Sequence, residues 1–534
     1  MLDKLPENQL DKKELSLKQK VGQLFMPAAF INDTEEEVQK LEKLIREHHI
    51  GAICFFHSRA SAATNFEGKK KVVHNEKSYD RLKQLISRYQ KAAKFPLLVA
   101  MDAEWGLAMR IENTPQYPYA ITLGALEDGK DLICEVGKQI GQDCREAGMH
   151  WNLAPVVDIN NNPENPVIGY RSFGDDKKSV LLKSKAFLEG MEQAGILNAI
   201  KHFPGHGDTA MDSHLGLPVI DKSLEELEEN ELYPFQELIK KGVDSVMVGH
   251  LSLPQLDSIE PSTTSSKIVT DLLRKKMGFD GVIISDALNM HAVSKKYAGK
   301  GELELATFLA GMDMLCFSEH VGQGIEKILE AAPEERINES FERIWQLKQK
   351  AFFKEPQKKQ IQKNSLKEFN QKLALGALTE LYGSPENVTE VKKSGFLNLS
   401  WNNQVKNIFS KKLEETYGTE TLDLVTDHDA IKNKMAKAKN VVLALFPPAV
   451  KPKDLFGFNN EWLMHLKHLI SGKNVLIYLF GNPYAIDILE LKPTANVVIA
   501  YQNFEEFQVE AFHHFQGKIG AKGKLPIQLE TFKV

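Results

Sequence analysis

The 534-residue chain is poor in the features that mark several large classes of protein. Its four cysteines (Cys54, Cys134, Cys144 and Cys316) form no CxxC pair and no close histidine cluster, so the sequence indicates neither a disulfide framework nor a zinc site of common spacing. No run approaches the roughly 18 apolar residues of a membrane-spanning helix, and segment 1–20 lacks the apolar stretch of a secretory signal. We therefore expect a reduced, cytoplasmic protein with no membrane span, unless a leader was removed from the chain.

Positive charge is not in excess either. Lys and Arg total 67 and Asp and Glu total 72, which leaves a net charge of −5, and no long basic run stands out. Nucleic acid is therefore not an expected partner. The sequence contains no GxGxxG, GxxxxGK[ST], HExxH or GxSxG motif, so nucleotide binding, zinc proteolysis and serine hydrolysis have no motif to support them.

What the chain does contain is a regular alternation of short apolar runs and amphipathic stretches. With 42% hydrophobic and 26% charged residues it has an ordinary globular composition, and its length predicts two domains. Repeated βα units predict a parallel sheet of the α/β class. The eight expected strands are 21–28, 51–56, 97–101, 151–157, 198–202, 245–249, 281–285 and 313–317. Eight units predict a (β/α)8 TIM-like barrel over 1–354, with a doubly wound open sheet as the alternative.

The rest of the chain predicts a second domain. Segment 355–368 is polar and basic with no apolar period, as in a linker. Further apolar runs at 396–399, 441–446, 475–480 and 497–501 alternate with helical patterns such as 461–469. A smaller α/β domain is therefore expected over 369–534.

Polar side chains cluster where the expected barrel strands end, which is where barrel enzymes build their sites. In chain order they are Asp102 and Glu104 after the third strand, Asp158 after the fourth, Lys201 and His202 at the end of the fifth, His250 after the sixth and Asp286 after the seventh.

The densest polar segment is 198–218, NAIKHFPGHGDTAMDSHLGLP, and three interpretations of it compete. It could be a surface loop, or a metal site without recognisable ligand spacing. In the third interpretation Asp212 and His214 form an acid/base pair, because side chains two apart project to the same side and a carboxylate orients an imidazole for proton transfer. The metal interpretation would draw on His202, His206, Asp208, Asp212 or His214.

An acid/base pair needs a nucleophile, and Asp286 is the best candidate. It ends the apolar run in GVIISDALNM and would lie on the site face of the barrel. Its alternative role is to cap the next helix. Ser213, between Asp212 and His214, cannot easily lie in line with both, so a serine hydrolase is not predicted.

KHFPGHGDTAMDSH and GVIISDALNM together resemble the signature of glycoside hydrolase family 3, in its branch of β-N-acetylglucosaminidases that use an Asp-His pair. DAEWGLAMR at 102–110, NPVIGYRSFG at 165–174 and AGMDML at 310–315 resemble further family segments, with Trp105 where glycine is usual. FGNPYAI at 480–486 and GKLPIQL at 523–529 resemble the family's αβα sandwich domain. The resemblance spans nearly the whole chain.

This resemblance implies roles residue by residue. Asp286 would form a glycosyl-enzyme intermediate, while His214, oriented by Asp212, would protonate the leaving oxygen and then activate water. The −1 subsite would consist of Asp102, Arg171, Lys201 and His202. No metal or organic cofactor is implied. Arg171 could instead be a structural ion-pair partner of Asp102 or Asp158.

The expected function is that of a retaining exo-β-N-acetylglucosaminidase acting on short amino-sugar oligosaccharides such as cell-wall muropeptide fragments. A family 3 β-glucosidase, an N-acetylglucosaminide phosphorylase and a non-catalytic carbohydrate-binding protein are the alternatives. Glu104 could contact the substrate, but we expect it to neutralise Arg110, and we expect His206 and Asp208 to shape their loop. The sequence leaves the oligomeric state open.

Overall fold

The computed structural model describes residues 12, 15–57, 74–209, 216–353, 365–401 and 407–533, apart from the side chains of 353, 428 and 429. These residues form two compact units. The first, called the barrel unit, comprises Met1–Tyr117, Lys130–Ile159 and Val180–Gln360. The second, called the sheet unit, comprises Pro118–Gly129, Asn160–Ser179 and Ile361–Val534.

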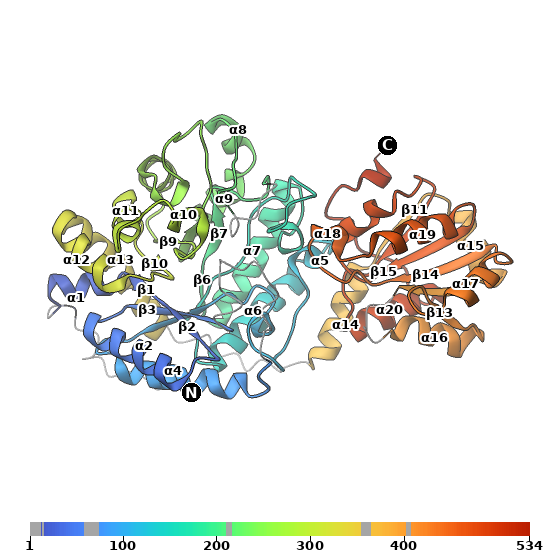
Figure 1. Ribbon diagram of the computed structural model, residues 1–534, viewed down its shortest axis with the longest axis horizontal. Helices are drawn as coiled ribbons and strands as arrows, with labels where there is room; N and C mark the ends of the chain where they lie inside the picture. Colours follow the sequence, from blue (N-terminus) through green and yellow to red (C-terminus); the bar gives the residue numbers. More distant parts are fainter. Residues whose placement is uncertain are drawn as a thin grey trace. The chain divides into compact units, whose positions relative to one another are not determined.

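The barrel unit is a closed ring of parallel strands, as the sequence predicts (Figure 1). Its strands are β1 (Phe25–Met26), β2 (Ala28–Phe30), β3 (Ala52–Phe56), β4 (Leu98–Met101), β5 (Trp151–Asn152), β6 (Leu197–Asn198), β7 (Ile200–Phe203), β8 (Ser245–Val248), β9 (Val282–Ser285) and β10 (Leu315–Cys316). Strands β2 to β6 pair in order, as do β7 to β9, and β1 pairs with β10. Bridges from Val156 to Lys201 and from Ile284 to Met314 join these sheets. Because β1 and β2 are separated only by Pro27, and β6 and β7 only by Ala199, the ring has eight strand positions, which confirms the predicted barrel.

Helices lie around these strands. They are α1 (Leu17–Gly22), α2 (Glu35–His48), α4 (Ser78–Ala92), α6 (Lys130–Glu146), α7 (Lys177–Ala194), α8 (Leu224–Glu229), α9 (Leu232–Lys241), the π-helical η6 (Lys267–Lys276), α10 (His291–Ser294), α11 (Glu302–Ala310), α12 (Val321–Ala331) and α13 (Glu334–Phe353), with 3-10 turns η3 (Leu107–Met109) and η5 (Ser262–Thr264). In α2, Thr34 and Glu37 form a capping box, and Val38, Leu41 and Ile45 recur at helical spacing as its buried face.

Side-chain alternation along β3 shows which residues face the barrel interior. Phe55 packs against Tyr89 of the outer helix α4, with ring centroids 6.2 Å apart. Its neighbour Phe56 therefore points inward, where its ring lies 6.0 Å from Phe30 and 5.1 Å from Phe317. These three rings pack together at the carboxyl-terminal ends of β2, β3 and β10.

The sheet unit is an open, mostly parallel six-stranded sheet in the order β11-β16-β15-β14-β12-β13. Its strands are β11 (Thr379–Tyr382), β12 (Leu397–Trp401), β13 (Thr421–Asp423), β14 (Asn440–Leu445), β15 (Asn474–Leu479) and β16 (Asn496–Ile499), of which only β11, at the edge, pairs antiparallel. Its helices are α5 (Ala120–Gly124), α14 (Leu366–Ala377), α15 (Pro385–Lys393), α16 (Ile408–Tyr417), α17 (His428–Met435), α18 (Lys453–Phe456), α19 (Asn460–Ile470) and α20 (Glu505–Phe515), with 3-10 turns η4 (Gly169–Arg171), η7 (Pro483–Leu489) and η8 (Glu530–Phe532).

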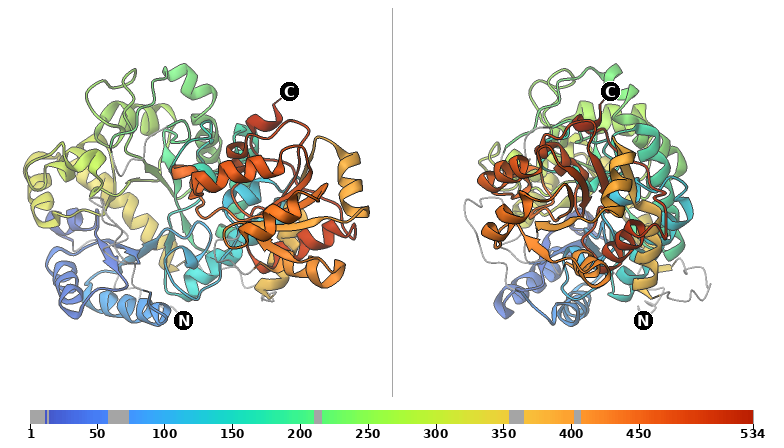
Figure 2. Two further views of the ribbon diagram at one scale, coloured as in Figure 1. Left: turned by 45° about the vertical axis from the view of Figure 1, so that its right-hand side comes forward. Right: turned by 90° about the vertical axis from the view of Figure 1, so that its right-hand side faces the viewer.

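Both faces of this sheet are covered (Figure 2). Val442 and Ala444 of β14 pack in one core cluster with residues of α15, α16 and α20. Val441 and Leu443, which alternate with them and so face the other side, are also fully buried. The sheet unit is therefore an αβα sandwich, as the family resemblance implies.

Two segments inside the expected barrel range 1–354 belong to the sheet unit, because their hydrogen bonds lead there. Lys524 donates its backbone N–H to the Ala125 carbonyl at 2.9 Å, and the amide of Asn160 donates to the Tyr484 hydroxyl at 2.8 Å. Asp175 likewise donates its backbone N–H to the Pro526 carbonyl at 3.1 Å. Pro118–Gly129 and Asn160–Ser179 are therefore packed with sequence more than 300 residues away.

Among the described residues, no helix is long and apolar enough to cross a membrane.

The amino-terminal end of the barrel contains an unusual buried cation. Lys348 of α13 is fully buried, and its ammonium group donates to the Gln23 side-chain oxygen at 2.5 Å and to the Pro96 carbonyl at 2.6 Å. Burial lowers the pKa of Lys348 to about 7.

We expect the contribution of Lys348 to stability to rise with pH. Between about pH 7 and the pKa of an unfolded lysine, about 10.4, the unfolded chain binds a proton that the folded protein does not. The free energy of unfolding therefore rises through this window, by up to about 1.4 kcal/mol per pH unit. In melting curves from about pH 6.5 to pH 9.5, the wild type should gain melting temperature relative to Lys348→Met. A constant or shrinking difference would contradict this expectation.

Candidate active site

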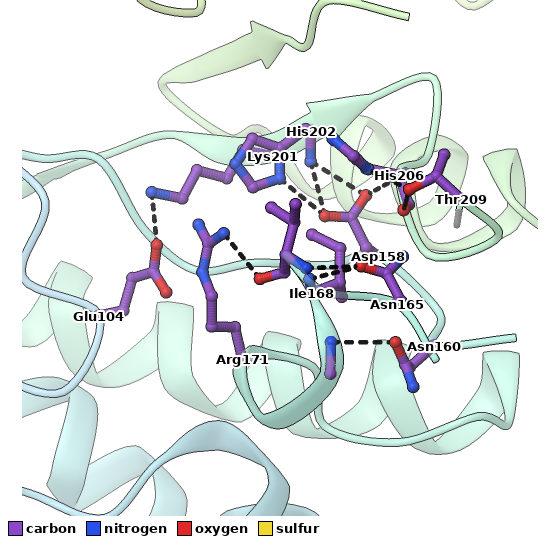
Figure 3. A network of polar contacts seen from close by, with 12 residues as sticks. Glu104, Asp158, Asn160, Asn165, Ile168, Arg171, Lys201, His202, His206 and Thr209 are labelled. Carbon is purple, nitrogen blue, oxygen red and sulfur yellow. Dashed lines mark hydrogen bonds and ion pairs between the residues drawn. The ribbon is translucent and has the colours of Figure 1, made fainter. Parts of the chain in front are cut away.

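At the carboxyl-terminal end of the barrel strands, Lys201 pairs with two carboxylates, one of which, Glu104, is drawn in Figure 3. Lys201 lies on β7 and is only 1% exposed. Its ammonium nitrogen is 2.7 Å from Oδ1 of Asp102 and 2.7 Å from Oε1 of Glu104, both of which follow β4. A buried ammonium group is stable only when such partners replace its hydration.

The partner of Glu104 differs from the one expected from the sequence. Glu104 pairs with Lys201, whereas Arg110 reaches Oδ2 of Asp102 at 3.1 Å. The guanidinium of Arg110 also lies 5.4 Å from the centre of the Phe56 ring. Because Lys201 is fully buried, its ammonium group pairs with Glu104 as well as with Asp102. Arg110 lies between Asp102 and the ring of Phe56.

These cations determine the charge of Asp102. Burial raises the pKa of this carboxyl group, but Lys201 and Arg110 more than offset that effect, so the pKa of Asp102 lies below its usual value. Asp102 is therefore ionised at neutral pH, and its oxygens are strong hydrogen-bond acceptors.

A second network is centred on Asp158, between His202 and His206 (Figure 3). Oδ1 accepts the backbone N–H of His206 at 2.8 Å, and Oδ2 lies 2.8 Å from Nδ1 of the His202 ring. The backbone N–H of His202 is 3.1 Å from both oxygens. Asp158 thus ties the end of β7 to the turn that follows it. Burial raises the pKa of Asp158, but His202 outweighs this effect and the net pKa is lowered.

The described part of the loop after β7 is held by its own polar residues. Nδ1 of His206 lies 2.9 Å from the Thr209 hydroxyl, and burial lowers the pKa of His206 to about 4. Lys222 bridges Asp208 and Glu231, at 2.6 Å from each. His206 and Asp208 therefore have structural partners, as expected. Among the residues the structure describes, no three His, Cys, Asp or Glu side chains are arranged to hold a metal ion.

Asp212 and His214, the predicted acid/base pair, lie outside the described residues.

Asp286 follows directly after β9, whose four residues are all buried. Its backbone N–H donates to the Val248 carbonyl at 2.9 Å, and Oδ1 accepts the N–H of Ala287 at 2.7 Å. The charge of Asp286 acts to raise the pKa of the His206 ring. The next helix, α10, begins five residues later with Met290 as its N-cap, so the alternative role of Asp286 as a helix cap is wrong.

Arg171 lies in the sheet unit, in the 3-10 turn η4. Its guanidinium donates to the Val167 carbonyl at 3.2 Å, and the side-chain oxygen of Asn165 accepts the N–H groups of Val167 and Ile168 at 2.9 and 2.8 Å (Figure 3). The turn that carries Arg171 is thus held by local hydrogen bonds.

Of the predicted site residues, Asp102, Lys201, His202 and Asp286 therefore all lie at the carboxyl-terminal rim of the barrel unit. From the sequence, Asp158 was expected only as a polar residue after a strand and as a possible ion-pair partner of Arg171, and its central place in the network was missed.

Comparisons with known proteins extend this picture. Residues 16–347 match the family model described as the glycosyl hydrolase family 3 N-terminal domain. A β-hexosaminidase A from Pseudoalteromonas piscicida is 30% identical over 419 residues, which cover 71% of this chain and 66% of that protein. A β-hexosaminidase from Tolumonas auensis is 37% identical over 238 residues, or 44% of this chain and 70% of that protein. A solved family 3 β-N-acetylglucosaminidase from Paenibacillus sp. is similar with a TM-score of 0.77 and 27% identity, covering 97% of this chain and 100% of that one.

Replacing Lys201 by Met should cost about 3–5 kcal/mol of stability, because two buried carboxylates lose their shared cation. Without Lys201, the effect of burial, which raises the pKa of Asp102, is opposed by Arg110 but no longer by the lysine. A carboxyl group whose folded pKa is raised begins to destabilise the fold above its unfolded pKa, and the loss is complete once the pH exceeds the folded pKa. The loss measured by thermal unfolding should therefore be smaller near pH 5 than near pH 8.

The control is Lys241→Met, which removes a lysine from a partly exposed ion pair with Glu189. That variant should lose less than about 1 kcal/mol. Equal losses for the two variants, or a Lys201→Met loss independent of pH, would contradict the assigned role of Lys201.

Proposed function

Because the chain belongs to glycosyl hydrolase family 3, we propose that it is a retaining exo-β-N-acetylglucosaminidase that removes terminal N-acetylglucosamine from short oligosaccharides. The observation that carries this proposal is the position of Asp286 at the end of β9, on the same barrel rim as Asp102, Lys201 and His202. The names of the relatives and of the solved neighbour support the choice of amino sugar.

In the proposed reaction Asp286 is the nucleophile. Its carboxylate attacks the anomeric carbon while the leaving oxygen takes a proton from His214, which Asp212 orients. His214 then removes a proton from water, and the water releases the sugar from Asp286. Two displacements at the same carbon retain its configuration, and the carboxylate also stabilises the oxocarbenium-like transition state.

The proposed −1 subsite binds sugar hydroxyls by charge-assisted hydrogen bonds. Asp102, ionised by its neighbours, accepts hydrogen bonds, and Lys201 donates them. His202 is held in place by Asp158. Arg171 is proposed as a fourth contact to the sugar.

The proposed natural substrates are cell-wall muropeptide fragments, which carry a β-linked terminal N-acetylglucosamine. We propose the cytoplasm as the compartment, supported by four cysteines that are all free thiols.

A substrate panel tests the proposal. The wild type should hydrolyse 4-nitrophenyl β-N-acetylglucosaminide with a kcat/KM at least about tenfold above that for the β-glucoside, with or without phosphate. Asp286→Ala should lower turnover by about three orders of magnitude or more, because it removes the nucleophile. Asp280→Ala changes an exposed aspartate two residues before β9, at the end opposite to Asp286; it is the matched control and should keep wild-type activity.

Each contrary result identifies a different protein. Preference for the glucoside would indicate a β-glucosidase, and N-acetylglucosamine 1-phosphate formed in phosphate buffer would indicate a phosphorylase. A folded wild type that turns over neither substrate would be a carbohydrate-binding protein.

The acid role of His214 predicts a dependence on the leaving group. His214→Ala should lower kcat/KM by about 100-fold or more for chitobiose, whose leaving alcohol needs a proton, and far less for the activated 4-nitrophenyl glycoside. Asp212→Asn should give a smaller loss in the same sense, because the imidazolium form loses its partner. Equal losses for both substrates would remove His214 from the acid role.

A further inference from the structure

Asp158 is the most completely buried acid at the site, with none of its side chain exposed. Both of its oxygens accept hydrogen bonds, from the backbone N–H groups of His202 and His206 and from the His202 ring. The arrangement has a consequence for substrate binding that rests on the function proposed above.

The contact between Asp158 and His202 determines where the imidazole carries its proton. An ionised carboxylate can only accept hydrogen bonds, so Nδ1 of His202, 2.8 Å from Oδ2, must carry a hydrogen. In the neutral ring the other nitrogen, Nε2, then has no hydrogen and is an acceptor. Lys201, the preceding residue, can only donate.

We infer that Asp158 is a positioning residue that makes Nε2 of His202 a hydrogen-bond acceptor in the −1 subsite. The sugar hydroxyl that contacts Nε2 must therefore donate its proton there. In the −1 subsite Lys201 can only donate a hydrogen bond and Nε2 of His202 can only accept one. A substrate whose substituent at this position has no proton to donate therefore loses the hydrogen bond to Nε2.

An asparagine at position 158 reverses this polarity without changing the shape of the side chain. The backbone N–H groups of His202 and His206 cannot become acceptors, so the amide oxygen must take the place of Oδ1. The amide NH2 then takes the place of Oδ2 and donates to Nδ1 of His202, and the backbone N–H of His202, which reaches both oxygens of Asp158, is left to the amide oxygen alone. That bond stabilises the other tautomer, in which Nε2 carries the hydrogen and becomes a donor.

Deoxyfluoro substrates report this polarity, because fluorine can accept a hydrogen bond weakly but cannot donate one. We would measure kcat/KM for 4-nitrophenyl β-N-acetylglucosaminide and its 3-, 4- and 6-deoxyfluoro analogues. The ratio of kcat/KM for the parent to kcat/KM for an analogue includes the inductive effect of fluorine. That effect is the same for every variant, so it cancels when the ratios of two variants are compared. For one position, the wild-type ratio should exceed that of His202→Ala by about tenfold, which corresponds to one hydrogen bond. Asp158→Asn should lower that ratio to about the His202→Ala value.

Asp244→Asn is the matched control. Asp244 is also a buried carboxylate that accepts a backbone N–H, from Asn198 at 3.1 Å, but it lies at the amino-terminal end of the barrel strands. Its substitution should lower the melting temperature and leave the parent-to-analogue ratios unchanged. A wild-type ratio retained by Asp158→Asn would overturn the inference, as would ratios equal in the wild type and His202→Ala at all three positions. Failure of the wild type to hydrolyse the parent substrate would instead overturn the proposed function.

A measurement on the wild type alone covers the case in which Asp158→Asn does not fold. In protein labelled with 15N-histidine, the resonances of His202, assigned by their loss in His202→Ala, should show a protonated Nδ1 and an unprotonated Nε2. A protonated Nε2, whether in the other tautomer or in the imidazolium form, would overturn the inference.

Discussion

A lysine that is 1% exposed can stay charged at position 201 only because Asp102 and Glu104 each lie 2.7 Å from its ammonium group. Removing these charges from water costs several kcal/mol per ion, and close pairing with further hydrogen bonds is what offsets that cost. The same contacts fix the end of β7 to the residues that follow β4. The site therefore has its polar groups oriented before any substrate arrives, which is the condition for electrostatic stabilisation of a transition state.

The two ends of the barrel strands use buried charge differently. At the amino-terminal end, Asp313 at the start of β10 is fully buried and accepts hydrogen bonds from Arg274 at 2.6 Å and Ser340 at 2.6 Å, which joins helices to the barrel. At the carboxyl-terminal end, the charged network shares its rim with Asp286, which is only partly buried. This division agrees with the general pattern of barrel enzymes, in which one face contributes stability and the other carries the chemistry.

Most of the barrel could be predicted from the sequence because each βα unit has a local signature. The apolar run before Asp286 is a buried strand, and the strand expected at 51–56 is β3, Ala52–Phe56. β11 and β13 were missed, because TELY is only partly buried and TLD has three residues, so neither gives an apolar run. The membership of Asn160–Ser179 in the sheet unit was missed because its partners, such as Tyr484, lie far along the chain.

The candidate site could be predicted only in part, for a related reason. Strand ends show which residues share a rim, but not which partner each one takes across it. The sequence therefore led us to pair Glu104 with Arg110, whereas in the structure Glu104 contacts the buried Lys201. The roles of Asp212 and His214 stay predictions, because both residues lie outside the described part of the chain.

The most direct test of the account is to identify the residue that bonds to the sugar. A 5-fluoro-N-acetylglucosaminyl fluoride has a reactive leaving group and slows release of the sugar from the enzyme, so the covalent intermediate should accumulate. Peptide mapping by mass spectrometry should then find one fluoro-sugar on Asp286. Attachment to another residue, or turnover of the reagent with no covalent adduct, would contradict the central claim that Asp286 is the nucleophile.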